Sequence, residues 1–218
     1  MEKLFIDNED IKLETEYYES NTDKKSGIVI CHPHPQIIWK SLKLGVYGGN
    51  MQNNVVSAVF NIFMSNDVSC LRFNFRAVGN STGTHSSGRG ELSDVKACID
   101  YLINNKKVEK VFICGYSYGA AIGCSTINHS EKVIGYASIS FPWDFIGPRY
   151  KKLSQANKPK LFIQGDRDDI ANFNNFQDHY AFYSVPKESV IIKGADHFYG
   201  GYERQAAEDV FRFYKSVK

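Results

Sequence analysis

The sequence of 218 residues has no excess of charge of either sign. Its 26 basic and 24 acidic side chains give a formal net charge of +2. A balance this even creates no extended field of one sign, and such a field is what draws basic proteins to nucleic acids and acidic lipids. We therefore expect neither nucleic acid nor a membrane among the partners of this chain.

Cysteine is also scarce, with five residues at positions 31, 70, 98, 114 and 124. The number is odd, and no two cysteines are two to four residues apart, which excludes a disulfide framework and the common zinc motifs. Most of them lie in apolar runs such as Gly27–Cys31. This pattern predicts buried free thiols in a reducing compartment.

Long hydrophobic runs are missing. The first residues lack the apolar stretch of a secretory signal, and no run approaches the roughly 20 residues that cross a bilayer. We expect a cytoplasmic location. Internal repeats, low-complexity tracts and linkers are absent too, so the prediction is a single domain over residues 1–218 with a hydrophobic core of ordinary size.

Two kinds of apolar pattern are present. Residues 4–6 and 11–19 alternate apolar and polar side chains, which predicts an antiparallel hairpin at a sheet edge. From residue 27 onward, continuous apolar runs predict strands at 27–31, 68–75, 110–114, 133–140, 160–164 and 189–193. Helical spacing between them predicts helices near 52–65, 91–105, 117–129, 170–183 and 201–217. This order indicates an α/β fold with a mostly parallel, doubly wound sheet and helices on both faces.

In such a sheet the functional site lies at the carboxyl ends of the strands. The segment Gly115–Gly119 there has the form Gly-x-Ser-x-Gly, and Ser117 stands between a predicted strand and a predicted helix. This context is typical of a nucleophile elbow, in which flanking glycines avoid clashes. The segment Gly79–Gly83 has the same form, but a polar loop follows Ser81. We therefore predict Ser117 as the nucleophile and a structural turn at Ser81.

A serine nucleophile needs a histidine as general base, oriented by a carboxylate. Among six histidines, His197 alone follows the end of a late strand, in Gly194–His197, and we assign it as the base. His179 is expected to be a solvated helix residue.

The carboxylate is expected in the loop after the strand at 160–164, where three aspartates occur. Asp166 suits a brace of its own turn and Asp169 a helix cap, which leaves Asp168 as the predicted acid. Asp144 is the alternative.

An oxyanion hole needs two backbone N–H donors. The residue after the nucleophile, Tyr118, supplies one. In the turn Cys31–Pro35, Pro33 and Pro35 have no N–H, so His34 is the predicted second donor. A metal site at His32 and His34 is the alternative, although no third ligand with motif spacing accompanies them.

The chain resembles the α/β-hydrolase superfamily, and within it a group of small lidless hydrolases with a His-Pro-His-Pro turn. The resemblance rests on the stretches 31–35, 71–83, 115–119, and 165–168 together with 194–197, and it spans roughly residues 26–215. It implies an α/β-hydrolase fold without a cap domain and a triad of Ser117, Asp168 and His197. It also implies that Ser81 belongs to the loop after the fourth strand.

Two departures from that group stand out. Residues Gln36 to Tyr47 form an apparent insertion beside the oxyanion turn, and Ala77 replaces a frequent glycine. The segment 37–39 and the pair Trp143–Asp144 are candidate walls of an acyl pocket, although core packing is the more ordinary interpretation of such aromatics.

The predicted activity is hydrolysis of small ester or thioester substrates through an acyl-enzyme, with no cofactor and no metal. The alternatives are a peptidase similar to the dipeptidyl and oligopeptidase branches, and a non-catalytic interaction module on the same fold. The sequence does not indicate the oligomeric state.

Overall fold

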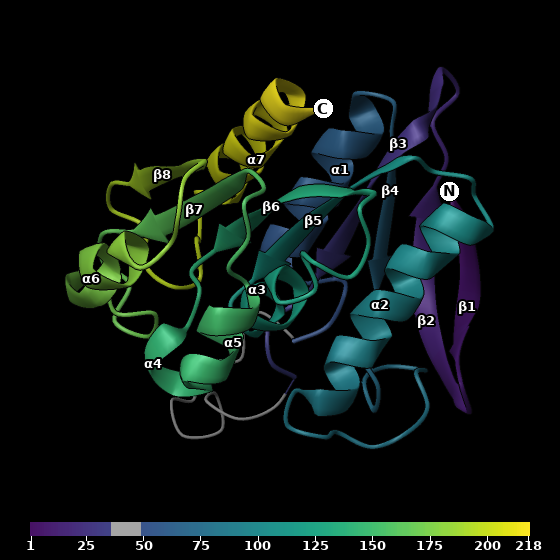
Figure 1. The fold of residues 1–218 in the computed structure, drawn as a ribbon, viewed down its shortest axis with the longest axis horizontal. Helices are drawn as coiled ribbons and strands as arrows, with labels where there is room; N and C mark the ends of the chain where they lie inside the picture. Colours follow the sequence, from purple (N-terminus) through teal and green to yellow (C-terminus); the bar gives the residue numbers. More distant parts are fainter. Residues whose placement is uncertain (36–48) are drawn as a thin grey trace.

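The computed structural model describes residues 1–35 and 49–218, and these residues form one eight-stranded sheet covered by helices (Figure 1). The strands are β1 (Glu2–Asn8), β2 (Ile11–Tyr18), β3 (Asp23–Cys31), β4 (Val68–Phe73), β5 (Lys110–Tyr116), β6 (Val133–Ile139), β7 (Lys160–Gly165) and β8 (Lys187–Ile192). Across the sheet their order is β1-β2-β4-β3-β5-β6-β7-β8. The hairpin β1–β2 is antiparallel and β2 joins β4 antiparallel, whereas β4, β3 and β5 to β8 are parallel. The predicted fold class is confirmed.

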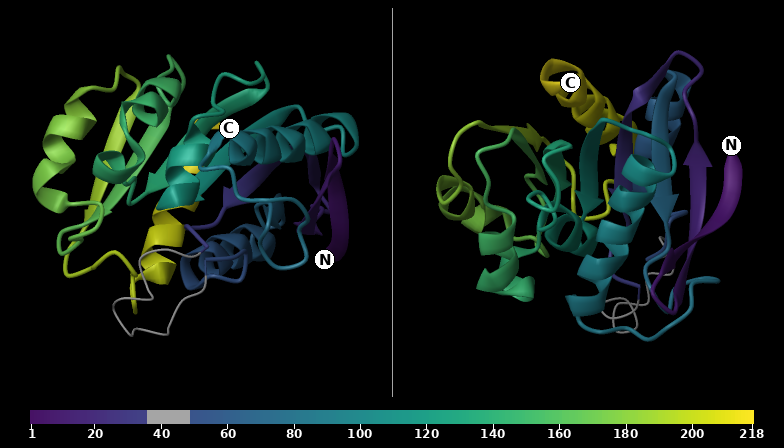
Figure 2. Two further views of the ribbon diagram at one scale, coloured as in Figure 1. Left: turned by 90° about the horizontal axis from the view of Figure 1, so that it is seen from below. Right: turned by 45° about the vertical axis from the view of Figure 1, so that its right-hand side comes forward.

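Helices lie on both faces of the sheet (Figure 2). They are α1 (Asn54–Ser65), α2 (Arg89–Asn104), α3 (Tyr118–Cys124), α4 (Trp143–Ile146), α5 (Pro148–Leu153), α6 (Phe176–Ala181) and α7 (Glu203–Val217), with a 3₁₀ turn at η1 (Phe173–Asn175). Side chains of α1 and α7 form one core layer with Ile28 and Ile30 of β3, while α2 and α3 form the other with Val29 and Cys31. Because both faces are covered, both sets of alternating side chains are apolar.

Two predicted helices are shorter than their sequence pattern. The helix expected over 117–129 ends at Cys124, because the Ser125 and Thr126 hydroxyls donate to carbonyls of the preceding turn at 2.6 and 2.7 Å. The helix expected from residue 170 begins at Phe176, because Asp168 accepts hydrogen bonds from the backbone N–H groups of the preceding turn. The short helices α4 and α5 were not predicted, since four to six residues carry too little periodicity to detect.

All five cysteines are buried and free, which confirms the prediction of buried thiols. Burial raises the pKa of Cys31 and Cys98 well above the ordinary value of a thiol. Within residues 1–35 and 49–218, no helix combines the length and the apolar character that crossing a membrane requires.

Candidate functional site

A sharp turn joins β5 to α3 at Ser117. The residue has φ of 54° and ψ of −120°, a left-handed conformation that costs energy for a side chain other than glycine. A Cβ at Gly115 would overlap the carbonyl oxygen of Gly119, and a Cβ at Gly119 would overlap the carbonyl of Cys31. The two glycines therefore let α3 approach both β5 and the end of β3, as the elbow pattern predicts.

Three residues that are distant in the sequence form a hydrogen-bonded chain at this turn. The Ser117 Oγ lies 2.9 Å from Nε2 of His197, and Nδ1 of His197 lies 3.0 and 2.9 Å from the two carboxylate oxygens of Asp168. His197 and Asp168 are only 3% and 1% exposed. Because a carboxylate only accepts, Nδ1 carries the proton and Nε2 can accept from the serine hydroxyl. The geometry is that of a nucleophile, a base and an orienting acid.

A second set of buried side chains holds the acid and the base, and the sequence reasoning did not identify it. Ser140, directly after β6, donates from Oγ to Asp168 Oδ2 at 2.6 Å and also contacts the Tyr199 hydroxyl at 2.8 Å. The Tyr116 hydroxyl donates to the carbonyl of His197 at 2.5 Å. Burial raises the pKa of both tyrosines, so their hydroxyls stay protonated. The only sequence signal is that Ser140 ends an apolar run at the same sheet edge as Ser117.

Asp168 is the acidic residue that reaches His197. Its Oδ1 also accepts from the backbone N–H groups of Ile170 and Ala171 at 2.9 and 2.8 Å, which fixes the carboxylate in place. Asp166 was expected to brace its own turn, but it makes a different contact. Its Oδ1 accepts from the N–H of Gly194 at 2.6 Å, which ties the loop after β7 to the loop after β8.

The cap expected at Asp169 is provided by another residue, and Asp144, the alternative acid, contacts a different histidine. The cap of the next turn is Asn172, whose Oδ1 accepts from the N–H of Asn174, because that residue precedes η1 directly. Asp144 lies on α4, where its Oδ1 contacts Nε2 of His179 at 2.9 Å, so it does not reach His197. His179 is correspondingly not a simply solvated residue: its ring also stacks on Trp143 with centroids 5.0 Å apart.

Ser81 makes two hydrogen bonds to backbone. Its Oγ donates to the carbonyl of Asn74 at 2.8 Å and accepts from the N–H of Glu14 in β2 at 2.9 Å. The residue is 8% exposed. The first hydrogen bond closes the loop after β4 and the second holds that loop against the hairpin, so the predicted structural turn at Ser81 agrees with its position.

The predicted oxyanion turn lies against the start of α3. The ring centroid of His34 is 4.8 Å from that of Tyr118, which is the first residue of the helix and has an N–H without an intrahelical acceptor. His34 also faces His85 with centroids 5.0 Å apart, and His85 contacts the buried carboxylate of Glu91 at 2.9 Å. Burial, and then the neighbouring His85, lower the pKa of His34.

The metal interpretation of His32 and His34 is not supported. Nε2 of His32 accepts from the N–H of Phe75 at 3.0 Å, so Nδ1 carries the proton and donates to the carbonyl of Pro33 at 2.6 Å. Burial lowers the pKa of His32 to about 4. Both ring nitrogens of His32 are therefore engaged in hydrogen bonds. The described part of the chain has no cluster of three metal-binding side chains.

Of the two candidate acyl-pocket walls, only one can be placed. Trp143 is 7% exposed, stacks on Phe141 with centroids 5.0 Å apart and donates from Nε1 to Tyr183 at 3.0 Å. It is a core residue. The segment 37–39 and the insertion from Gln36 to Tyr47 lie outside the described residues.

This chain is similar to known proteins in both sequence and structure. Residues 47–210 match the family described as "Alpha/beta hydrolase domain". An uncharacterized protein of Rickettsia prowazekii is 29% identical over 91% of this chain and 82% of its own length. An alpha-beta serine hydrolase homologue from Coxiella burnetii is 30% identical, with a TM-score of 0.82 over 97% of this chain and 96% of that one.

A serine hydrolase without a lid, from Xanthomonas campestris, has a TM-score of 0.79 over 99% of this chain and 94% of its own. Its 22% identity supports the fold alone. The family match covers most of the sequence, including the elbow and the residues that Ser117 contacts. This chain belongs to the alpha/beta hydrolase domain family.

Proposed function

We propose that this hydrolase cleaves small ester or thioester substrates through an acyl-enzyme on Ser117. The observation that carries the proposal is the hydrogen-bonded chain from Ser117 through His197 to Asp168. A serine hydroxyl is a weak nucleophile near neutral pH, and a hydrogen-bonded imidazole held by a carboxylate is the arrangement that activates it.

In the proposed reaction, Ser117 Oγ attacks the substrate carbonyl carbon while Nε2 of His197 takes the hydroxyl proton. His197 then gives that proton to the departing alcohol or thiol, and the acyl group stays on Ser117. Water enters, gives a proton to His197 and attacks the acyl carbon; the proton returns to Ser117 as the carboxylic acid leaves. The N–H groups of Tyr118 and His34 are the proposed donors to the oxyanion.

The length of the segment between β6 and β7 favours small substrates. Residues 140–159 contain only the short helices α4 and α5, so they provide no cap domain. A site without a cap domain buries less of a long acyl chain, and each additional methylene would contribute little to binding. We therefore propose short acyl groups as the preferred substrates.

A fluorophosphonate probe, which labels activated serines, tests the proposal. We expect labelling of the wild-type chain and of Ser81→Ala, and no labelling of Ser117→Ala. Ser81→Ala is a matched control, because it also removes a nearly buried serine hydroxyl in a Gly-x-Ser-x-Gly segment. An unlabelled wild-type protein, or label lost only in Ser81→Ala, would overturn the proposal.

Substrate class is tested with matched leaving groups. We expect turnover of nitrophenyl acetate and butyrate to exceed that of the palmitate ester by roughly tenfold or more, because a site without a cap domain gains little binding energy from distal methylenes. Amide analogues of the same acyl groups should react far more slowly. Faster cleavage of an aminoacyl amide than of its ester would favour the peptidase interpretation instead.

A further inference from the structure

The free edge of β1 combines exposed charge and an exposed aromatic ring in a symmetrical pattern. β1 is the first strand in the sheet order, and among residues 1–35 and 49–218 it pairs on one side only, with β2. Along it, Ile6 and Asn8 are buried against α2, whereas Lys3, Phe5 and Asp7 are exposed on the opposite face. Phe5 is 51% exposed, which is unusual for a phenylalanine in a strand.

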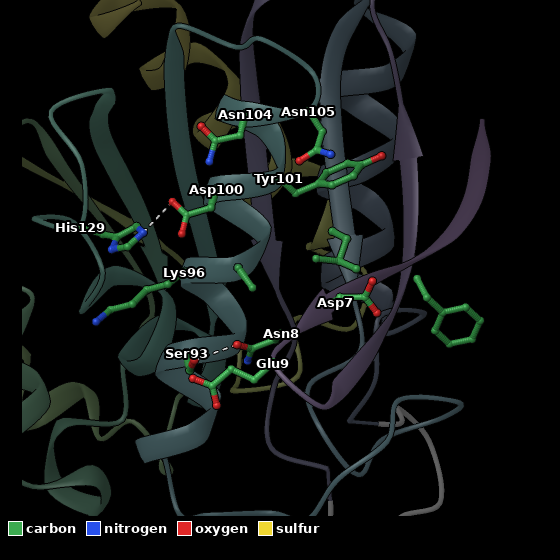
Figure 3. Close-up of a pocket in the computed structure, with 13 residues that line it drawn as sticks. Asp7, Asn8, Glu9, Ser93, Lys96, Asp100, Tyr101, Asn104, Asn105 and His129 are labelled. Carbon is green, nitrogen blue, oxygen red and sulfur yellow. Dashed lines mark hydrogen bonds and ion pairs between the residues drawn. The ribbon is translucent and has the colours of Figure 1, made fainter.

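A hollow of about 580 Å³ lies between β1 and α2, beside the contacts that Ile6 and Asn8 make with that helix, and α2 does not cover the opposite face of β1 (Figure 3). Asn8 points toward α2 and accepts a hydrogen bond from Ser93, whereas Asp7 points away from the helix (Figure 3). A row of backbone groups on such an edge is a ready template for another strand.

The backbone pattern of the hairpin identifies which groups are available. Asn8 and Ile11 close a two-residue turn, so they form a hydrogen-bonded pair and the pattern alternates along the strands from there. The even-numbered residues of β1 therefore bond to β2. The N–H and C=O groups of Lys3, Phe5 and Asp7 point to the outer side.

We propose that two copies of this chain pair β1 with β1 in antiparallel register about Phe5. In this register Phe5 faces Phe5 of the second copy, and Lys3 of each chain faces Asp7 of the other. All the outward backbone groups named above then find partners, and two sheets join across a twofold axis. Each pair of opposite charges on one face stabilises the contact, and the two rings cover each other.

Charge selects this register over its neighbours. The two nearest registers that also pair outward backbone groups would place Lys3 or Asp7 opposite Phe5 and lose both pairs of opposite charge. A register centred on Lys3 or on Asp7 would place like charges directly opposite each other, which is unfavourable. In a register shifted by one residue, the outward backbone groups of one strand would face residues whose own backbone groups already bond to β2. Such a shift would also place buried side chains of one copy on the same face as exposed side chains of the other. Charges on an edge strand ordinarily discourage pairing, but here a second copy is the strand that neutralises them.

Charge-reversal variants test the proposal by sedimentation. The wild-type chain, tagged only at its C-terminus, should reach twice its mass of 24.7 kDa as its concentration rises toward about 0.2 mM. Lys3→Asp and Asp7→Lys should each weaken self-association by at least about tenfold, because like charges then face each other. An equimolar mixture of the two variants should associate again, since every facing pair is opposite in charge.

Both variants should keep the fold, because Lys3 and Asp7 are about three-quarters exposed and the Asp7–Lys12 pair lies on the surface. The buried Glu16, which Lys3 contacts at 3.7 Å, keeps its ion pair with Arg72 at 2.6 Å in both variants. Circular dichroism and thermal unfolding check this. The control Ile191→Lys places a new charge on β8, at the opposite edge of the sheet, and should leave the association unchanged.

Disulfide trapping tests the register itself. The five native cysteines are buried, so an introduced thiol is the one available to an oxidant. Phe5→Cys should form an intermolecular disulfide, since facing Cα atoms of a hydrogen-bonded pair lie about 5.5 Å apart. Lys3→Cys should not, because its counterpart lies four residues along, roughly 14 Å away.

Several outcomes would overturn the proposal. One is a wild-type chain that remains a monomer throughout the concentration range. Another is equal association of the two charge variants and the wild type, or loss of association in Ile191→Lys. Equal cross-linking of Lys3→Cys and Phe5→Cys would exclude the register. None of these measurements depends on the activity proposed for Ser117.

Discussion

We expect the small side chain of Ser140 to have a large effect on catalysis, because its hydroxyl lies between Asp168 and Tyr199 and hydrogen-bonds directly to both. Its φ of 48° places it in the left-handed region, so the chain accepts local strain to aim this oxygen at the carboxylate. We expect Ser140 to orient Asp168 and, through Asp168, to position His197, without contacting the substrate.

We predict that Ser140→Ala lowers kcat for ester hydrolysis by about tenfold and leaves KM nearly unchanged. The substitution removes a hydrogen bond to a buried carboxylate, which contributes roughly 1.5–3 kcal/mol. Steady-state kinetics with a nitrophenyl ester measures the effect. Tyr199→Phe, which removes a hydroxyl one bond farther from Asp168, should have the smaller effect. Unchanged kcat in Ser140→Ala would contradict this role.

His32 makes the fold sensitive to acid. Burial lowers the pKa of His32 to about 4, whereas an unfolded histidine titrates near 6.5. As pH falls below the unfolded value, the unfolded chain binds a proton that the folded chain does not, until the folded pKa is reached. The free energy of unfolding should therefore fall by up to about 3 kcal/mol across that window, and be unaffected by His32 at higher pH.

Urea unfolding at several pH values tests this effect. His32→Gln should be less stable near neutral pH, because the site is tightly packed, but should lose less stability on acidification. The control His129→Gln changes a partly exposed histidine paired with Asp100 and should retain the acid sensitivity of the wild type. Equal acid slopes for His32→Gln and the wild type would contradict the assignment.

At the scale of elements, α3 is the helix whose position decides the site. It contacts β5 and the end of β3 closely because Gly115 and Gly119 have no side chains, and its first residue then lies beside the turn that contains His34. Its early end at Cys124 is set by local hydrogen bonds of Ser125 and Thr126. The close approach of α3 to the sheet therefore depends on the absence of a Cβ atom at Gly115 and at Gly119.

We predict that Gly119→Ala destabilises the chain by about 1–3 kcal/mol or more and strongly reduces probe labelling. The added Cβ would overlap the backbone oxygens of Cys31 and His32, and backbone cannot rotate away as a side chain can. Chemical denaturation and fluorophosphonate labelling measure the two effects. Gly200→Ala is the control, since nothing lies within 4 Å of its Cβ position. Equal stability of both variants would refute the packing argument.

At the scale of the whole molecule, the two core layers on either side of the sheet contain all five thiols. Cys31, Cys98 and Cys124 lie in the layer that α2 and α3 cover, and Cys70 and Cys114 lie in the other. Burial raises the pKa of each thiol, so none forms a thiolate readily in the folded chain. The cysteines consequently report on the integrity of both layers.

We predict that the native chain reacts with a thiol reagent only as fast as it unfolds, and that all five thiols become reactive together in denaturant. Absorbance of released thionitrobenzoate measures the number and the rate. Reaction in two groups, with Cys70 and Cys114 separate from the rest, would show instead that the two layers open independently. Dithiothreitol should leave the thermal midpoint unchanged, because the cysteines are free.

The sequence by itself determined the order and type of the long elements and the position of the elbow. Continuous apolar runs mark strands buried on both faces, and the glycines around Ser117 record a close approach of backbone, so both signals are local. The same local logic predicted a loop at Ser81 and a strand-to-helix turn at Ser117, and the structure has both. The end of α3 at Cys124 and the start of α6 at Phe176 were not predicted, because hydrogen bonds from side chains to the backbone outweigh the helical spacing of apolar residues there.

Only the tertiary structure decided which aspartate faces His197 and what holds it. Asp166, Asp168 and Asp169 are neighbours of the same type, and their distinct contacts depend on where the loop after β8 and the residue after β6 meet them. The roles of Ser140, Tyr116 and Tyr199 are likewise invisible in the sequence. Hydrogen bonds between residues 28 to 81 positions apart have no local pattern, because folding alone brings those side chains within 3 Å of each other.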